Sequence, residues 1–402
     1  MRAMSPLTSR GFSLIELLVA LVIAMIGTIA IMQVYISGEA GKRALGSLGE
    51  AQSGALVALY QIEREMQRAG YGFLDRQALG CNIRSSFAGF NNLTLQPVSI
   101  VPDGAAVGHI ANRWGIPPGD PGSDMLIISA GNGATLIEGS RLALAANAGD
   151  GVIHLVNKSG ISAGAYLLIA EAGQDCTLTK ASLVNPPNVD DQVQVQTPMF
   201  AGYSTDNARV MQLTVPPQPL PPPSSQPKPS FVVYTVRNGM LTRCDFTASN
   251  CADAGAINNP QVWTPVANDV VALVAQYGFD TSTPADGVVD AFCKTRLTPG
   301  GSCPGSDTGL TDAPGSDADQ TVRAEDWSRV LAIQLAVVTR SGQAEKDPVS
   351  PVTLKLWPDN ANAADGPLTQ GPVWNVPDQY YRYRVARTIV PLRNVIWQGG
   401  QR

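Results

Sequence analysis

The fold of this chain is decided by residues 12–36, which read FSLIELLVALVIAMIGTIAIMQVYI. The last twenty of these positions, 17–36, carry no charged side chain. A helix of that length spans roughly 30 Å, the thickness of the hydrocarbon core of a bilayer. The sequence therefore predicts that residues 12–37 form a membrane-spanning helix.

Charged residues beside this segment predict its orientation. Arg2 and Arg10 precede it, and the first eleven residues contain no acidic side chain. Positive charge favours the cytoplasmic side, so the short N-terminal tail is expected in the cytoplasm and the rest of the chain across the membrane. Lys42 and Arg43, just after the span, weaken this bias without reversing it.

One carboxylate, that of Glu16, lies at the edge of the apolar run. An acidic side chain in a span costs about 2.5–3.5 kcal/mol, so such residues mark function. If the chain is cut after Gly11, Phe12 gains an α-amino group four residues before Glu16, on the same helix face. The two charges can then neutralise each other, within one chain or between neighbours.

Two other interpretations of this segment are a secretory signal peptide and a plain membrane anchor. A signal peptide needs a small-residue cleavage site after its apolar run, and residues 37–41, SGEAG, match one poorly. A plain anchor gives Glu16 no role.

Residues 38–70 continue the helix with a different pattern. Four glycines between positions 38 and 49 are expected to make it pliable. Apolar residues then recur at spacings of three and four, opposite a charged side, and the stripe consists of Leu56, Leu59, Ile62 and Met66. The pattern predicts an amphipathic helix that covers a globular domain and ends at Gly70.

The stretch SRGFSLIELLVALVIAMIG resembles the class III signal and helix of type IV pilins and pseudopilins. The resemblance implies that residues 1–11 are a leader removed by prepilin peptidase between Gly11 and Phe12. It also implies methylation of the new amine of Phe12 and a role for Glu16 in setting the register of assembly. The implied fold is α+β, a long N-terminal helix packed on a large β-rich head.

From residue 71 onward, short apolar runs are bounded by Gly, Pro, Asn and Asp, which is typical of antiparallel strands. Asn238-Gly239 marks a hairpin between residues 231–236 and 240–243. The other predicted strands are 125–129, 152–156, 165–170, 270–277, 330–339 and 381–390. Residues 216–230 are rich in proline and cannot enter a sheet interior, so we expect them to link two β-rich lobes, 71–215 and 231–402.

Six cysteines follow the membrane span, which suits an oxidising compartment and disulfides. Six cysteines allow fifteen pairings. The pairing we expect joins Cys244 to Cys251 and Cys293 to Cys303 across short polar loops, which leaves Cys81 with Cys176. A zinc site is the rival interpretation, but no C-x-x-C occurs and both histidines are distant in sequence.

Further segments resemble the PilW family of minor type IV pilins, in the order that the family shows. They are QIEREMQRAGYGF, FVVYTVRNGMLTRC, VALVAQYGFDTSTPADGVVD, WSRVLAIQLAVVTRS and YRYRVARTIVPLRNVIW. This resemblance implies a minor pilin that assembles by docking its helix with other pilins. Alternatives are a minor pseudopilin of a type II secretion system and a membrane-anchored adhesin or binding module.

The resemblance also implies partners and a location. The partners are other minor pilins, the major pilin, prepilin peptidase, the inner-membrane assembly platform and, before assembly, the lipid bilayer. The expected location is the bacterial inner membrane, as a single pass with a periplasmic head, and later the pilus surface. The size of the head favours a priming or tip complex over the repeated wall of a fibre.

Catalysis, cofactors and nucleic-acid binding are not expected. The net charge is −5, so the chain has no basic excess with which to bind nucleic acid. It has only two histidines, which leaves little material for histidine-based catalysis. Residues 160–164 match G-x-S-x-G, but both histidines precede Ser162, so we interpret the segment as a turn.

Metal binding is also not expected. A weak calcium-loop candidate formed by Asp280, Asp286 and Asp290 departs from the calcium motif at three positions. A turn stabilised by aspartate is the simpler interpretation.

Overall fold

The structure is a computed structural model. It describes residues 13–86, 93–103, 114–133, 139–184, 191–196, 198–217, 219–220, 222, 226–294, 326–357 and 373–399, without the side chains of 36–45, 47–48 and 50–51. The chain divides into two compact units, Met1–Glu50 and Ala51–Arg402. The second unit is called the head below.

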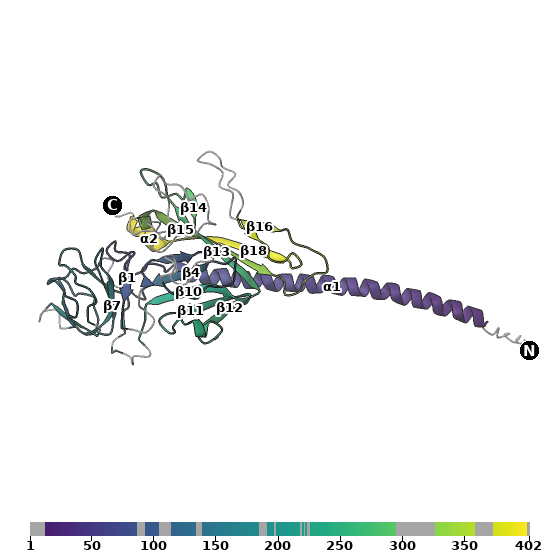
Figure 1. Ribbon diagram of the computed structural model, residues 1–402, viewed down its shortest axis with the longest axis horizontal. Coiled ribbons are helices and arrows are strands. Elements are labelled where there is room, and N and C mark those ends of the chain that lie inside the picture. Colours follow the sequence, from purple (N-terminus) through teal and green to yellow (C-terminus); the bar gives the residue numbers. More distant parts are fainter. Residues whose placement is uncertain are drawn as a thin grey trace, which may run out of the picture. The chain divides into compact units, whose positions relative to one another are not determined.

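Helix α1, Leu14–Met66, runs through the first unit and into the second (Figure 1). Its first turn is closed by a capping contact, because the carboxylate of Glu16 accepts a hydrogen bond from the backbone N–H of Ser13 at 3.1 Å. The helix ends four residues before the predicted Gly70, which has a φ of +77° and lies in the turns that follow.

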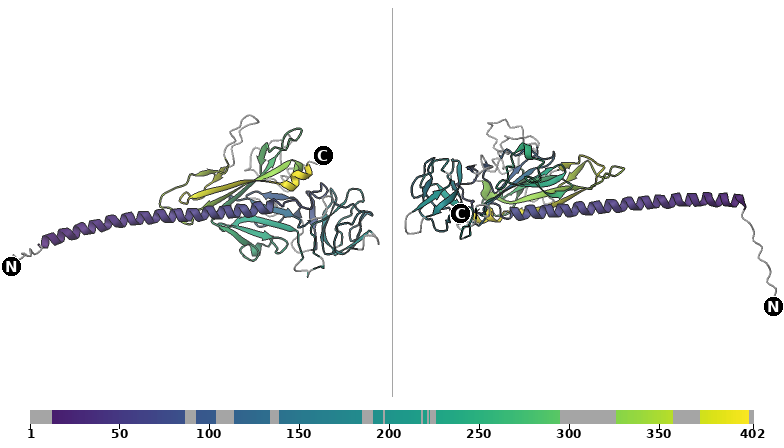
Figure 2. Two further views of the ribbon diagram at one scale, coloured as in Figure 1. Left: turned by 180° about the vertical axis from the view of Figure 1, so that it is seen from behind. Right: turned by 90° about the horizontal axis from the view of Figure 1, so that it is seen from below.

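The turns that follow α1 are hydrogen-bonded to a helix near the C-terminus. Helix α2, Arg393–Gly399, lies beside it (Figure 2), and the side-chain amide of Asn394 donates a hydrogen bond to the carbonyl of Ala69 at 3.0 Å. The last carbonyls of a helix lack partners within the helix. Asn394 therefore satisfies a group in the turns just after α1.

The part of α1 in the head buries one stripe. Leu59, Ile62 and Met66 are buried, as the periodicity predicts. Leu56 is a correction, since it is 57% exposed and Ala55 and Ala58 take the inward positions, joining Leu59, Ile62 and Met66. Small side chains let the helix backbone approach the strands, so the stripe turns away from Leu56.

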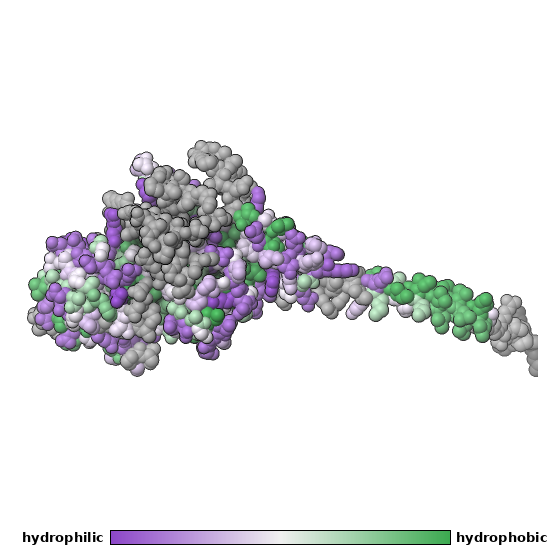
Figure 3. All heavy atoms as spheres, viewed as in Figure 1, coloured by the Kyte–Doolittle hydropathy of each residue, from purple (hydrophilic) through white to green (hydrophobic). Residues whose placement is uncertain are grey.

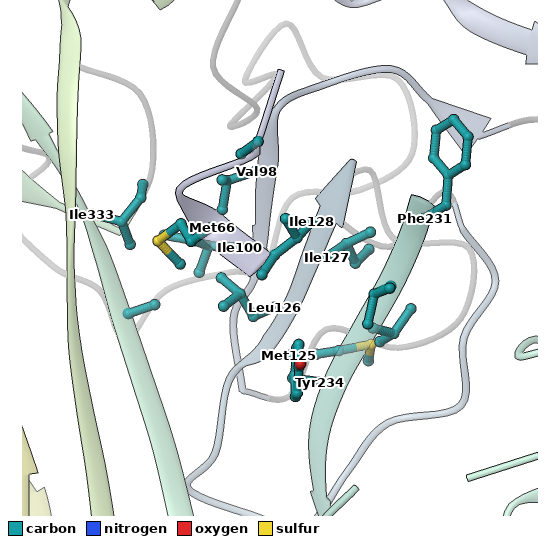
Figure 4. Packing of buried hydrophobic residues seen from close by; sticks show 14 of the residues in the cluster. Met66, Val98, Ile100, Met125, Leu126, Ile127, Ile128, Phe231, Tyr234 and Ile333 are labelled. Atoms are coloured by element: carbon teal, nitrogen blue, oxygen red, sulfur yellow. The ribbon is translucent and has the colours of Figure 1, made fainter. Parts of the chain in front are cut away.

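Figure 4 shows Met66 among side chains of two different sheets. Ile100 and Leu126 belong to a five-stranded sheet and Ile333 to a four-stranded sheet. All are buried in one continuous cluster. The stripe of α1 therefore packs against both sheets and forms the centre of the core.

The five-stranded antiparallel sheet has the order β12-β11-β10-β4-β3. Its strands are β3 (Val98–Val101), β4 (Met125–Ala130), β10 (Ser230–Arg237), β11 (Met240–Asp245) and β12 (Thr264–Asn268). Strands β10 and β11 form the predicted hairpin, with Asn238 and Gly239 at φ values of 53° and 70°. Positive φ at both turn residues is what a tight hairpin requires.

The four-stranded antiparallel sheet has the order β14-β13-β15-β18. Its strands are β13 (Val270–Phe279), β14 (Ala291–Cys293), β15 (Val330–Arg340) and β18 (Tyr383–Pro391), and β15 is preceded by the 3-10 helix η4 (Asp326–Arg329). One of its faces joins the main core, and the other packs on Trp357 and Trp374. The buried Tyr277 links it to the five-stranded sheet, because its hydroxyl accepts from Ile100 N at 2.8 Å and donates to Val98 O at 3.2 Å.

The seven-stranded sheet has the order β2-β1-β7-β6-β9, with β8 pairing β7 and β5 pairing β8. Only its β1–β7 pairing is parallel among the described strands. The strands are β1 (Asn82–Arg84), β2 (Leu93–Thr94), β5 (Val152–His154), β6 (Tyr166–Ala170), β7 (Cys176–Val184), β8 (Gln192–Val195) and β9 (Arg209–Gln212). A second hydrophobic cluster, separate from the main core, lies on this sheet.

The remaining elements are small. Strands β16 (Thr353–Lys355) and β17 (Val373–Asn375) form a two-stranded sheet, and the 3-10 helix η3 covers Ala254–Ala256.

The predicted α+β class, with a long N-terminal helix and a large β-rich head, is confirmed. The five-stranded sheet combines strands from both sides of the Pro-rich range 216–230, because β4 from the first predicted lobe pairs with β10 from the second.

Two of the expected disulfides are present. Cys81 bonds Cys176 with their Cα atoms 5.8 Å apart, and Cys244 bonds Cys251 with a Cα separation of 5.9 Å. The first bond joins the segment that follows α1 to the seven-stranded sheet. Cys293 is buried in the core, and its expected partner Cys303 lies outside the described residues.

Candidate functional site: an exposed apolar helix and an arginine-lined cavity

The first part of α1 exposes an unbroken apolar surface. Residues Leu14–Tyr35 have a mean hydropathy of 2.7, and none of the membrane-length window within them is buried (Figure 3). Large side chains such as Ile23 and Met32 are 64% and 65% exposed. The segment is long and apolar enough to cross a membrane, and a surface of this kind needs lipid or other apolar helices around it.

Glu16 is the one charged side chain within this segment. It lies in the first turn of α1, where the positive end of the helix dipole stabilises a carboxylate. Its contact with the backbone of Ser13 is local, and no cationic side chain in the described part of the chain pairs with it. A carboxylate in this position is available to a positive group from outside the described residues.

Thr28 is the polar counterpart within the same segment. Its hydroxyl donates to the carbonyls of Ala24 and Met25 at 3.0 and 2.8 Å. Its hydrogen bonding is therefore satisfied within the helix, whereas Glu16 has no cationic partner in the part of the chain that the structure describes. Gly11 and Phe12 lie outside the described residues, so cleavage and methylation at these positions stay predictions.

The G-x-S-x-G segment is a turn that leads into β6. Gly160 and Gly164 have positive φ values of 87° and 83°. The backbone N–H of Ser162 donates to the side chain of Gln212 at 3.1 Å. His154 lies on β5 with its Nδ1 atom 2.8 Å from Asp191, so its ring is held by a neighbouring carboxylate.

The three aspartates of the calcium candidate act as caps within their own loop. Asp280 is buried and accepts from the N–H groups of Ser282 and Gly287 at 3.0 and 2.8 Å. Asp286 accepts from Val288 N at 2.9 Å. Across the described residues, no group of three or more His, Cys, Asp or Glu side chains is arranged to hold a metal ion.

Asp290 is the most heavily hydrogen-bonded of the three aspartates. One of its oxygens accepts from the backbone and side chains of Thr281 and Ser282 at 2.7 to 3.1 Å. Desolvation opposes these bonds, but together they lower the pKa of the Asp290 carboxyl below its ordinary value.

The structure shows one feature of the head that sequence reasoning missed. A cavity of about 350 Å³ lies beside α1, and it is lined by Gln61, Arg64, Glu65, Arg68, Tyr234 and Arg243. The sequence places Arg64 and Arg68 on the outer side of the helix, but nothing in it indicates that the hairpin residue Arg243 lies beside them. Glu65 and Arg243 are 178 positions apart.

Comparison with known proteins matches two parts of the chain. The profile of the prokaryotic N-terminal methylation motif matches residues 7–32. The profile described as type IV pilus-assembly protein W matches residues 233–394, which contain most of β10, all strands from β11 to β18 and the start of α2. No curated protein and no solved structure matches the chain. These two matches confirm the resemblance to PilW-type pilins, the N-terminal motif through residues 7–32 and the later segments through residues 233–394.

Proposed function

We propose that this chain, a pilin of the type IV pilus kind by its two matched segments, is a minor pilin that takes part in pilus assembly. It would act structurally, by docking, and not as a catalyst. The observation that carries the proposal is the carboxylate of Glu16, which has no cationic partner among the described residues and lies in the first turn of an exposed apolar helix.

The docking mechanism follows from the first turn of α1. Cleavage between Gly11 and Phe12 creates an amine one helical turn before Glu16, and methylation keeps that amine positively charged. When subunits pack side by side, the carboxylate of Glu16 pairs with the amine of a neighbour. In an apolar environment this attraction is much stronger than in water, so only the register that brings the charges together is stable.

The large head supports a place at one end of the assembly. Among its described residues, the head, Ala51–Arg402, holds sheets of seven, five, four and two strands. A domain of this bulk fits a priming or tip complex better than the repeated wall of a fibre. In this proposal the chain inserts into the inner membrane with its N-terminus in the cytoplasm, and its partners are other minor pilins and the major pilin.

The processing step is tested by expressing the full chain with and without prepilin peptidase and determining the N-terminal residue by mass spectrometry. The expected mature chain begins at Phe12, with one added methyl group. A mature chain that begins at any other residue would contradict the proposal.

The docking step is tested with Glu16→Ala, and Thr28→Ala is the matched control in the same span. Glu16→Ala is expected to remain in the membrane but to be incorporated into pili at a level reduced about tenfold or more, because a buried charge pair is lost. Thr28→Ala, whose hydroxyl bonds only its own helix, is expected to assemble normally. Equal incorporation of the two variants argues for a plain anchor instead.

A further inference from the structure

The cavity beside α1 has walls from two distant parts of the sequence. Gln61, Arg64 and Arg68 come from the helix, and Tyr234 and Arg243 are cross-strand partners on β10 and β11. Both walls belong to the same compact unit, so the cavity is a feature of the head itself.

Arg243 is held in place by the carboxylate that shares the cavity. Its Nη2 and Nε atoms lie 3.1 and 3.3 Å from the same oxygen of Glu65, and Nη2 lies 3.7 Å from Asp245. Glu65 is the one carboxylate among the residues that line the cavity, and this contact engages it. The lining therefore keeps an excess of positive charge.

That excess comes from Arg64 and Arg68. They are four residues apart on α1, which places them on one face of the helix, and both are exposed. No carboxylate in the described part of the chain forms an ion pair with either side chain. Two guanidinium groups on adjacent turns are suited to grip a planar carboxylate.

Tyr234 adds a neutral hydrogen-bond donor at the buried side of the cavity. Its ring is 1% exposed and is seen among the core side chains in Figure 4. Burial, reinforced by the nearby charge of Glu65, raises the pKa of the Tyr234 hydroxyl, although Arg243 acts in the opposite direction. The phenol thus keeps its proton at neutral pH.

An apolar patch continues the same helix face. Leu56, Val57 and Tyr60 are 57%, 51% and 63% exposed, and Tyr60 lies one turn before Arg64. A partner segment that lies along this face meets apolar side chains first and guanidinium groups next. This sequence of an apolar patch followed by positive charge is complementary to a protein segment that has an acidic residue beside apolar residues.

We propose that the cavity binds a carboxylate side chain from an acidic segment of a neighbouring pilin subunit. The proposal rests on the pilin function proposed above and adds a second contact between subunits, made by the head and separate from the pairing of Glu16. Arg64 and Arg68 bind the incoming carboxylate, Gln61 offers its side-chain amide, and Arg243 supplies a fixed positive wall.

The first test measures binding of a carboxylate probe to the full chain in non-ionic detergent. The probe is fluorescein-labelled hexaglutamate, followed by fluorescence anisotropy. Replacing both Arg64 and Arg68 by Gln is expected to weaken binding about tenfold or more, because hydrogen bonds to charged groups are lost. The matched control replaces Arg76 and Arg141 by Gln, which removes the same charge at exposed positions outside the cavity and is expected to change binding less than about twofold.

Two outcomes of this measurement would overturn the proposal. One is equal binding by the two double variants, which means that hexaglutamate senses only net charge. The other is a site that takes inorganic phosphate, added as a separate ligand, while it ignores hexaglutamate. That result would point to a phosphate group as the occupant.

The second test locates the contact in cells. A photo-crosslinking residue replaces Gln61 in the full chain, and adducts are identified by mass spectrometry. The expected adduct joins this position to an acidic segment of another pilin subunit, and it is lost when Arg64 and Arg68 are both replaced by Glu. An adduct that persists after charge reversal, or one formed with lipid, contradicts the proposal.

The same samples separate this proposal from the function on which it rests. Chains that begin at Phe12 and enter pili normally, but whose adducts ignore charge reversal, leave the pilin function intact and exclude the carboxylate site. Chains that are not processed at Phe12 refute the pilin function whatever the cavity binds.

Discussion

Two parts of helix α1 have similar apolar residues but opposite exposure to solvent. In Leu14–Tyr35, large aliphatic side chains cover every side of the helix and none of its membrane-length window is buried. In the head, one stripe is buried and the opposite face carries charge. A helix with one apolar stripe can bury that stripe against a sheet. A helix that is apolar all round needs an apolar environment on every side. The difference shows which part of the helix is completed by the chain and which part requires other molecules.

The largest test of this comparison is a pair of truncations. Ile62→Ala removes a fully buried side chain, and we expect it to lower the free energy of unfolding of the head by about 2–5 kcal/mol. Ile26→Ala, at a position 63% exposed, is expected to leave that free energy unchanged. Denaturant unfolding of the full chain in detergent, followed by near-UV circular dichroism, measures both. A similar loss for the two variants would mean that the first part of α1 also supports the head.

The second test places a larger side chain in the buried stripe of α1. Ala58 is fully buried against the sheets, so Ala58→Leu is expected to destabilise the head by about 1–3 kcal/mol. Ala24→Leu, in the apolar segment, is expected to have no effect on unfolding of the head because no sheet covers that position. The comparison fails if the head tolerates leucine at position 58 as well as it tolerates alanine.

The third test removes the contact at the end of α1. Asn394→Ala deletes the hydrogen bond to the carbonyl of Ala69, and we expect a loss of about 1 kcal/mol. Asn394→Asp keeps the shape but loses the donor, so it is expected to lose at least as much. Thermal unfolding of both variants measures the effect, and a neutral Asn394→Asp would show that the donor is not needed.

The smallest expected effect concerns Asp290, whose carboxylate accepts four hydrogen bonds within its own loop, whereas the structure shows one, from Ser13, to Glu16. Its folded-state pKa is lowered, so its contribution to stability is present above the unfolded pKa and is lost as the pH falls through the folded value, which is below 3.8. The melting temperature of Asp290→Asn is therefore expected to be slightly below wild type at pH 7, and this difference is expected to shrink as the pH falls from 3.8 through the folded pKa. A difference that does not shrink with falling pH would exclude this origin.

The sequence predicted what is local. The apolar segment, the stripe residues Leu59, Ile62 and Met66, and the β10–β11 hairpin depend on periodicity and on a two-residue turn, which neighbouring positions determine. The strands at 125–129, 152–156, 165–170, 270–277, 330–339 and 381–390 were also predicted, and β4, β5, β6, β13, β15 and β18 confirm them with small shifts at their ends.

What the sequence did not predict depends on contacts between distant residues. The pairing of β4 with β10 crosses the Pro-rich range, and composition carries no information about which strands become neighbours. The outward position of Leu56 depends on how closely Ala55 and Ala58 approach the strands. The cavity exists only because the hairpin brings Arg243 to Glu65.

The hydrogen bond from Asn394 to the turn after α1 has a consequence for the order in which the molecule is completed. Residues of β15, β18 and α2 belong to the same core cluster as the stripe of α1, yet these elements come much later in the sequence than α1. The core around the stripe is therefore complete only after these elements have been synthesised. A product terminated before β15 would therefore lack part of the core that packs with the stripe and would leave that part of the stripe exposed to solvent.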